Sequence, residues 1–99
     1  MGIYIEIKKI KTENCLHYYQ VIPHDFKEII PFNICIDSKN NLLHLFKAKD
    51  ETQKSTINLK NYLDTNIDWL PIELVARILA RVIEAVKKQE FPEYISHCS

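Results

Sequence analysis

The sequence predicts an α+β fold in which an antiparallel sheet of four to five strands packs on one long C-terminal helix. Apolar residues alternate with polar ones through much of the first sixty residues, the period of two that is typical of strands with one buried face. Near the C-terminus the apolar spacing changes to three and four, which indicates a helix. Because 99 residues are about the size of one domain, we expect residues 1–99 to form a single domain.

Two strands joined by a short turn are expected at the N-terminus. The first covers roughly residues 3–11, where three isoleucines alternate with polar neighbours. Ile10 falls out of this register, which indicates a β-bulge at Lys8-Lys9 or the end of the strand there. After a polar turn, a second alternating strand is predicted over 15–22.

Three more strands are predicted in the middle of the chain. Residues 32–37 and 42–47 have the pattern of a hairpin, because Asp and Asn residues between them favour a turn. The polar residues after 47 lack periodicity and predict an exposed loop. A short fifth strand is expected at 56–59.

The predicted helix covers roughly residues 71–90. Pro71 suits a first helical turn, where its missing N–H costs nothing, and Pro92 disfavours helix at the residue before it. We expect residues 91–99 to form a C-terminal tail. The apolar stripe of this helix consists of Leu74, Val75, Ile78, Leu79, Val82, Ile83 and Val86.

Composition excludes several classes of function. Thirteen basic residues balance thirteen acidic ones, so we expect no nucleic-acid partner. No apolar run approaches the ~20 residues of a membrane span, and an odd number of cysteines without a secretory signal predicts a cytoplasmic protein and no membrane partner. The single glycine excludes a glycine-rich phosphate loop, and we expect no cofactor.

Two arrangements of chemistry-bearing residues are candidates for a site. Cys15 and His17, with His44 or Cys35, offer zinc-ligand types, but their spacing lacks the close pairs of structural zinc motifs. His17 and His44 on paired strands would supply the acid and base of a small metal-independent nuclease or hydrolase. Because neither pattern amounts to a signature, we expect no catalytic or metal-binding residues and no enzymatic activity.

The aromatic residues exceed what one helix against one sheet face must bury. We therefore expect some of them on the second face of the sheet, where aromatic residues among charges favour a protein-contact surface. The residues predicted to bind a partner are Glu6, Tyr18, Tyr19, Asp50, Glu51, Tyr62 and Asp64.

Three segments, 3–10, 34–37 and 91–98, resemble small bacterial immunity proteins of contact-dependent growth inhibition and other polymorphic toxin systems. The resemblance covers the whole length and specifies no site residue. It implies a cytoplasmic protein that binds and neutralises a cognate toxin domain, such as a nuclease. The alternative is a homo-oligomeric structural or assembly module, in which the helix stripe or an uncovered sheet face or edge forms a homodimer.

Overall fold

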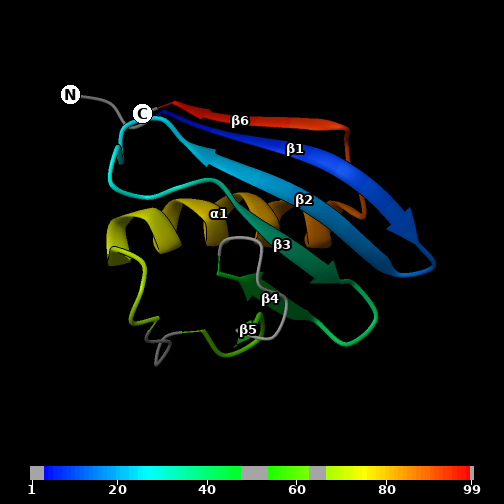
Figure 1. The fold of residues 1–99 in the computed structure, drawn as a ribbon. Coiled ribbons are helices and arrows are strands. Elements are labelled where there is room, and N and C mark those ends of the chain that lie inside the picture. The colour runs from blue at the N-terminus through cyan, green and yellow to red at the C-terminus, as the bar shows by residue number, and fades with distance from the viewer. Residues whose placement is uncertain (1–3, 48–53, 63–66, 99) are drawn as a thin grey trace.

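The computed structural model describes residues 4–47, 54–62 and 67–98, and it confirms the predicted α+β class (Figure 1). The elements in chain order are β1 (Tyr4–Glu13), β2 (Leu16–Pro23), β3 (Phe32–Asp37), β4 (Leu42–Phe46), β5 (Lys54–Asn58), α1 (Ile72–Lys88) and β6 (Tyr94–Cys98). The strands form one antiparallel sheet in the order β5-β4-β3-β2-β1-β6. The sheet thus has six strands, slightly more than the four to five expected.

The β1–β2 hairpin contains the expected bulge, close to the predicted position. The register of the two strands shifts between Lys9 and Lys11, so Ile10 has no partner in β2 and its side chain is 53% exposed. The strands are joined through Asn14, whose φ of 55° is left-handed. Asparagine is one of the few residues other than glycine that adopts this conformation readily. The chain has only one glycine, so here asparagine takes the place in the turn that glycine often has.

The β3–β4 turn is stabilised by the side chain of Asp37. One carboxylate oxygen accepts hydrogen bonds from the backbone N–H groups of Lys39 at 3.2 Å and Asn40 at 3.1 Å, and the other accepts one from the Asn40 amide at 2.9 Å. Asn41 then adopts a left-handed φ of 55°. This is the Asx turn chemistry that the sequence predicts between strands 32–37 and 42–47.

Helix α1 begins just after Pro71, and its predicted stripe forms one side of the core. Leu74, Ile78 and Val82 are at most 1% exposed and pack against the sheet. The helix ends two residues before the predicted Glu90, because Gln89 adopts a left-handed φ of 54° and its backbone N–H caps the last turn. At 17 residues the helix is about 25 Å long, and the chain continues from its end into β6, at the opposite edge of the sheet from β5.

The predicted C-terminal tail is partly a strand, which corrects the expectation for residues 91–99. β6 pairs with β1, placing Ile95 opposite Ile7. Its five residues contain only one aliphatic side chain, so alternation within the segment is a weak signal. Pairing with β1 supplies the backbone hydrogen bonds, and Ile95 adds its side chain to the core.

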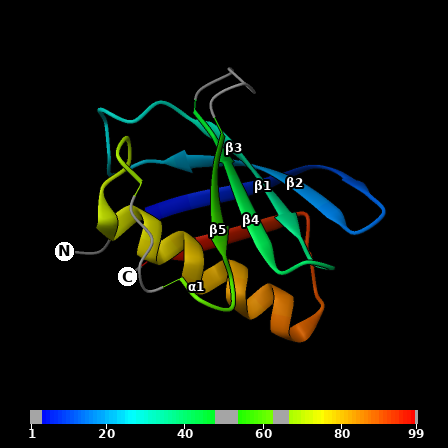
Figure 2. The same cartoon turned by 90° about the horizontal axis from the view of Figure 1, so that it is seen from below.

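The two faces of the sheet have different surroundings. Helix α1 lies along one of them (Figures 1 and 2), where the core contains Ile5, Ile7, Tyr19, Val21, Phe32, Ile34, Ile36, Leu43, Leu45 and Ile57. Among the described residues no second helix covers the other face. We call it the open face; its register positions include Tyr4, Glu6, Lys8, Lys11, Glu13, Leu16, Tyr18, Gln20, Ile22, Asn33, Cys35, Asp37, Leu42, His44, Phe46, Lys54, Thr56, Asn58 and Tyr94.

Candidate partner-binding surface

The open face carries several apolar side chains that are partly accessible. Tyr18, Ile22, Leu42 and Phe46 are all of intermediate burial, so part of each side chain meets solvent. They come from β2 and β4, on either side of β3. Alternation along each strand brings these side chains to the face away from α1. Apolar groups in such a position keep solvent-accessible area that a partner can cover.

At the β6 edge of this face, four polar side chains gather beside the carboxylate of Glu6. We call Tyr4, Glu6, Lys8, His24 and Tyr94 the Glu6 cluster. One Glu6 oxygen, Oε1, accepts hydrogen bonds from the Tyr4 hydroxyl at 3.1 Å and from His24 Nε2 at 2.8 Å, and Lys8 lies 3.4 Å from Oε2. The rings of Tyr4 and His24 stack with centroids 4.8 Å apart.

The hydrogen bonds of the cluster have a defined direction. The hydroxyls of Tyr4 and Tyr94 are 3.2 Å apart, and either one could donate to the other. Because the single Tyr4 hydroxyl proton is given to Glu6, Tyr94 must be the donor to Tyr4. The order is therefore Tyr94 to Tyr4 to Glu6. His24 must likewise carry a proton on Nε2, since the carboxylate only accepts.

The electrostatics of the cluster favour a charged Glu6. Partial burial raises the pKa of Glu6, but the hydrogen bonds from His24, Tyr4 and Lys8 outweigh this effect and hold the pKa below its ordinary value. The pKa of Tyr4 is raised, with its pairing to the Tyr94 hydroxyl as the largest cause, followed by burial and by the proton that Tyr4 donates to Glu6. Tyr4 therefore stays protonated at neutral pH, and Glu6 remains ionised.

In the middle of the open face, Tyr18 covers a buried thiol. Cys35 is 3% exposed and lies opposite Tyr18 on one side and His44 on the other. Burial is the main cause of the raised pKa of the Cys35 thiol, which shares a hydrogen bond with the Tyr18 hydroxyl. Lys11 lies 4.9 Å from the centre of the Tyr18 ring, a cation–π geometry. The Cys35 thiol is thus protonated at neutral pH, and Tyr18 is partly accessible above it.

The structure places two of the predicted partner-binding residues, Glu6 and Tyr18, on the open face. Tyr19 lies on the opposite face, where it is 0% exposed and its hydroxyl donates to the Pro92 carbonyl at 2.6 Å, so its side chain contributes to the core and not to a surface. Tyr62 is 39% exposed beside α1, away from the Glu6 cluster. The other three, Asp50, Glu51 and Asp64, lie outside the described residues.

The residues considered for zinc or acid–base chemistry are not brought together. His17 points to the α1 side, where it is 9% exposed and stacks on Phe91 with centroids 3.7 Å apart. His44 and Cys35 belong to the open face, so the sheet separates them from His17. In the described part of the chain no three His, Cys, Asp or Glu residues are grouped to hold a metal ion.

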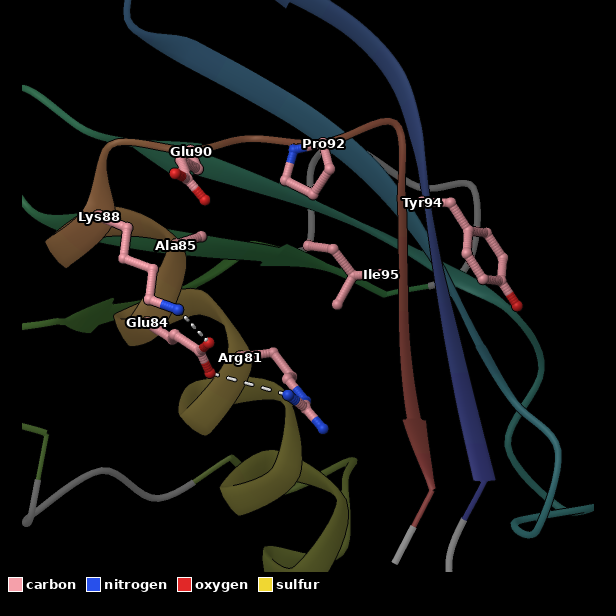
Figure 3. Close-up of a pocket in the computed structure, with 8 residues that line it drawn as sticks. All are labelled: Arg81, Glu84, Ala85, Lys88, Glu90, Pro92, Tyr94 and Ile95. Atoms are coloured by element: carbon pink, nitrogen blue, oxygen red, sulfur yellow. Dashed lines mark hydrogen bonds and ion pairs between the residues drawn. The ribbon is translucent and has the colours of Figure 1, made fainter.

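A hollow of about 180 Å³ lies on the α1 side of β6 (Figure 3). Figure 3 shows Ile95 pointing toward the helix, while Tyr94 points away from it. Glu84 pairs with Lys88 at 3.0 Å and with Arg81 at 3.7 Å across the mouth. The hydrogen bond from Lys88 is the main cause of the lowered pKa of Glu84. Since this carboxylate already has two basic partners, the hollow offers less to a ligand than the open face does.

Sequence reasoning missed four members of the Glu6 cluster. Tyr4 and Lys8 could have been found, because a period of two places them on the same face as Glu6. His24 follows the predicted end of the second strand, and Tyr94 belongs to a strand that was not predicted. No local signal connects either of them to Glu6.

Comparisons with known proteins add no relative. No family model matches the sequence, and neither the curated proteins nor the solved structures contain a match. Within the described ranges, no helix has both the length and the apolar character needed to cross a membrane.

Proposed function

We propose that this chain is an immunity- or antitoxin-type protein that binds and neutralises a cognate bacterial toxin domain through its open face. The observation that carries the proposal is the Glu6 cluster, in which the exposed Tyr94 is tied through Tyr4 to a charged carboxylate. Neutralisation by binding needs no chemistry in the binder. It requires a surface that covers the toxin's active site.

The composition of the open face supports this function. Protein interfaces combine an apolar centre with a polar rim, and they are enriched in tyrosine. Here Tyr18, Ile22 and Phe46 supply accessible apolar area, and the Glu6 cluster supplies a polar edge. A typical interface covers about 800 Å² on each partner, an area that the exposed face of a six-stranded sheet can provide.

Preorganisation of the cluster also supports binding. The Tyr4 ring is held by its stack on His24 and by hydrogen bonds on both sides of its hydroxyl. A side chain that is already ordered loses little entropy when a partner covers it, and each immobilised side chain otherwise costs about 0.5–1.5 kcal/mol. The Tyr94 hydroxyl uses its proton to donate to Tyr4, so its oxygen can still accept a hydrogen bond from a partner.

Co-expression with the product of the adjacent gene, which this proposal expects to contain a toxin domain, tests the proposal. The wild-type chain should restore growth and bind the purified toxin domain in calorimetry. Tyr94→Ala should weaken binding at least about tenfold, the loss typical of an interface anchor. Tyr62→Ala is the matched control, because Tyr62 is also exposed but lies beside α1.

A third variant isolates preorganisation. Tyr4→Phe keeps the ring but removes the link between Tyr94 and Glu6, so it should weaken binding less than Tyr94→Ala does. Circular dichroism must show that each variant is folded. The proposal fails if the wild-type chain does not bind the neighbouring toxin domain, or if Tyr62→Ala abolishes binding while Tyr94→Ala has no effect.

A further inference from the structure

The outer edge of β6 carries backbone groups that have no strand to pair with. β6 is the last strand of the sheet, and in the described part of the chain no further strand lies on its outer side (Figure 1). The Lys9 N–H donates to the Glu93 carbonyl at 2.8 Å, so in this register every second residue, Ile95 included, directs its backbone groups toward β1. The residues that direct theirs outward are Tyr94, Ser96 and Cys98.

This edge lacks the features that commonly block strand pairing. Edge strands are often protected by lysine, by proline or by a bulge. The β6 segment, Tyr94–Cys98, contains no lysine or proline, and its register with β1 has no shift. At the opposite edge, β5 begins with the exposed Lys54 and is followed by the exposed Lys60. The two edges therefore differ, and β6 is the one that is open to a further strand.

The hollow on the α1 side of β6 lies where a side chain of a further strand would go. Its lining comes from α1, β6 and the segment between them, and none of the lining residues belongs to β1. Ala85, Pro92 and Ile95 give it apolar walls, and Ile95 points toward the helix (Figure 3). A strand added at the usual spacing of about 4.8 Å would place one side chain beside Ile95. At about 180 Å³ the hollow is smaller than the ~300–1,000 Å³ of a small-molecule pocket, so it suits a single side chain.

We propose that an extended segment of the protein partner pairs with the outer edge of β6 and places an apolar side chain in the hollow beside Ile95. This inference rests on the proposed function, whose surface it extends, because Tyr94 belongs both to the Glu6 cluster and to the outer edge of β6. A peptide that adds to a sheet edge gains affinity from main-chain hydrogen bonds and specificity from pockets for alternate side chains. The β6 edge offers both.

The size of this edge favours a partner over a second copy of the chain. Five residues at ~3.4 Å each make an edge about 17 Å long, and a sheet layer is about 10 Å thick, so pairing through β6 covers only about 170 Å². A stable interface needs about 800 Å² on each chain. Two copies joined edge to edge leave both open faces uncovered. A partner that covers the open face can reach this area, with its strand at the border on β6.

Hydrogen exchange of the isotope-labelled full chain, free and bound to the product of the adjacent gene, tests the pairing directly. In the free chain the outward amides of Tyr94 and Ser96 should exchange fast, whereas the Ile95 amide is bonded to β1 and should exchange more slowly. Binding should slow the outward amides at least about tenfold and change the Ile95 amide less. Coverage by side chains alone would not produce this alternation.

Two variants separate the backbone pairing from the hollow. Ser96→Pro removes an outward N–H without removing a bond to β1, so it should weaken binding at least about tenfold. Ser96→Ala keeps this N–H and should bind more tightly than Ser96→Pro. Ala85→Leu fills the hollow from the helix and should weaken binding to a similar extent. Ala80→Leu, the same change at an exposed position of α1, is the matched control and should leave binding unchanged. Circular dichroism checks that each variant is folded.

The outcomes distinguish this inference from the proposed function. Wild-type binding that both Ser96→Pro and Ala85→Leu leave unchanged, or outward amides that exchange in the complex as in the free chain, would overturn the strand pairing alone. Outward amides already protected in the free chain would show that the edge is occupied and would overturn it as well. Binding that both variants weaken, without rescue of growth, would support the pairing and overturn neutralisation. A wild-type chain that does not bind would overturn both.

Discussion

Tyr19→Phe isolates one hydrogen bond between the sheet and the segment that follows α1. The Tyr19 ring is 0% exposed, and its hydroxyl donates to the Pro92 carbonyl at 2.6 Å. A hydrogen bond of this kind contributes about 0.5–1.5 kcal/mol net. The expected loss is therefore about 1 kcal/mol. In a domain of this size that corresponds to roughly 4–8 °C in Tm.

The neighbouring tyrosine supplies the control. Tyr18→Phe makes the same chemical change one residue away, but on the open face, where only the bond to the Cys35 thiol is lost. It should change stability by less than about 0.5 kcal/mol. Urea unfolding followed by circular dichroism measures both. Equal stability of the two variants would show that the bond to Pro92 does not hold the segment after α1 against the sheet.

A second experiment on Tyr19 uses pH. Burial raises the pKa of Tyr19 to about 12, so the unfolded chain releases this proton at a lower pH than the folded one does. Stability should therefore fall as pH rises above about 10, the ordinary tyrosine pKa. Tyr19→Phe should reduce that alkaline loss, whereas Tyr18→Phe should reduce it less because Tyr18 is less buried.

Three further predictions concern other parts of the fold. Gln89→Gly should raise stability by about 1 kcal/mol in thermal unfolding, because Gln89 holds a left-handed φ of 54° that glycine adopts without strain. Burial, together with the charge of Lys9, lowers the pKa of His17, so the unfolded chain binds a proton at a higher pH than the folded chain does. Stability should therefore fall as the pH is lowered from about 7.5 to 5.5. His17→Gln should make this fall smaller, and the part that remains should come from His44, whose pKa is also lowered by burial. Asp37→Ala should cost about 1–2 kcal/mol in urea unfolding by removing three hydrogen bonds from the β3–β4 turn, and Asp37→Asn should cost less.

Much of the fold could be predicted because its elements have strong local patterns. The stripe from Leu74 to Val86 predicts both the helix and its buried side, and the residues at 37–41 predict the turn between β3 and β4. The bulge near Ile10 is visible in the sequence as a break in alternation. β6 could not be predicted in the same way, because a short segment with one aliphatic residue becomes a strand only when β1 is available to pair with it.

The candidate surface was less predictable than the fold. Alternation places Tyr18 and Tyr19 on opposite faces, but two adjacent tyrosines have the same hydrophobicity, so local sequence gives no preference for either. The surrounding residues decide which tyrosine is buried. Tyr19 packs in the core with Val21 and Ile34, whereas Tyr18 lies beside Cys35 and Lys11 on the open face.

The sequence by itself determined the period of each element, and with it the existence of one strongly apolar face on the sheet and one on the helix. Tertiary structure decided the order of the strands and the residues that meet at the sheet edge. Tyr4 and Tyr94 are 90 residues apart and touch only because α1 returns the chain to β1. That closure depends on the packing of the whole core and on backbone pairing between distant segments, neither of which has a local signature.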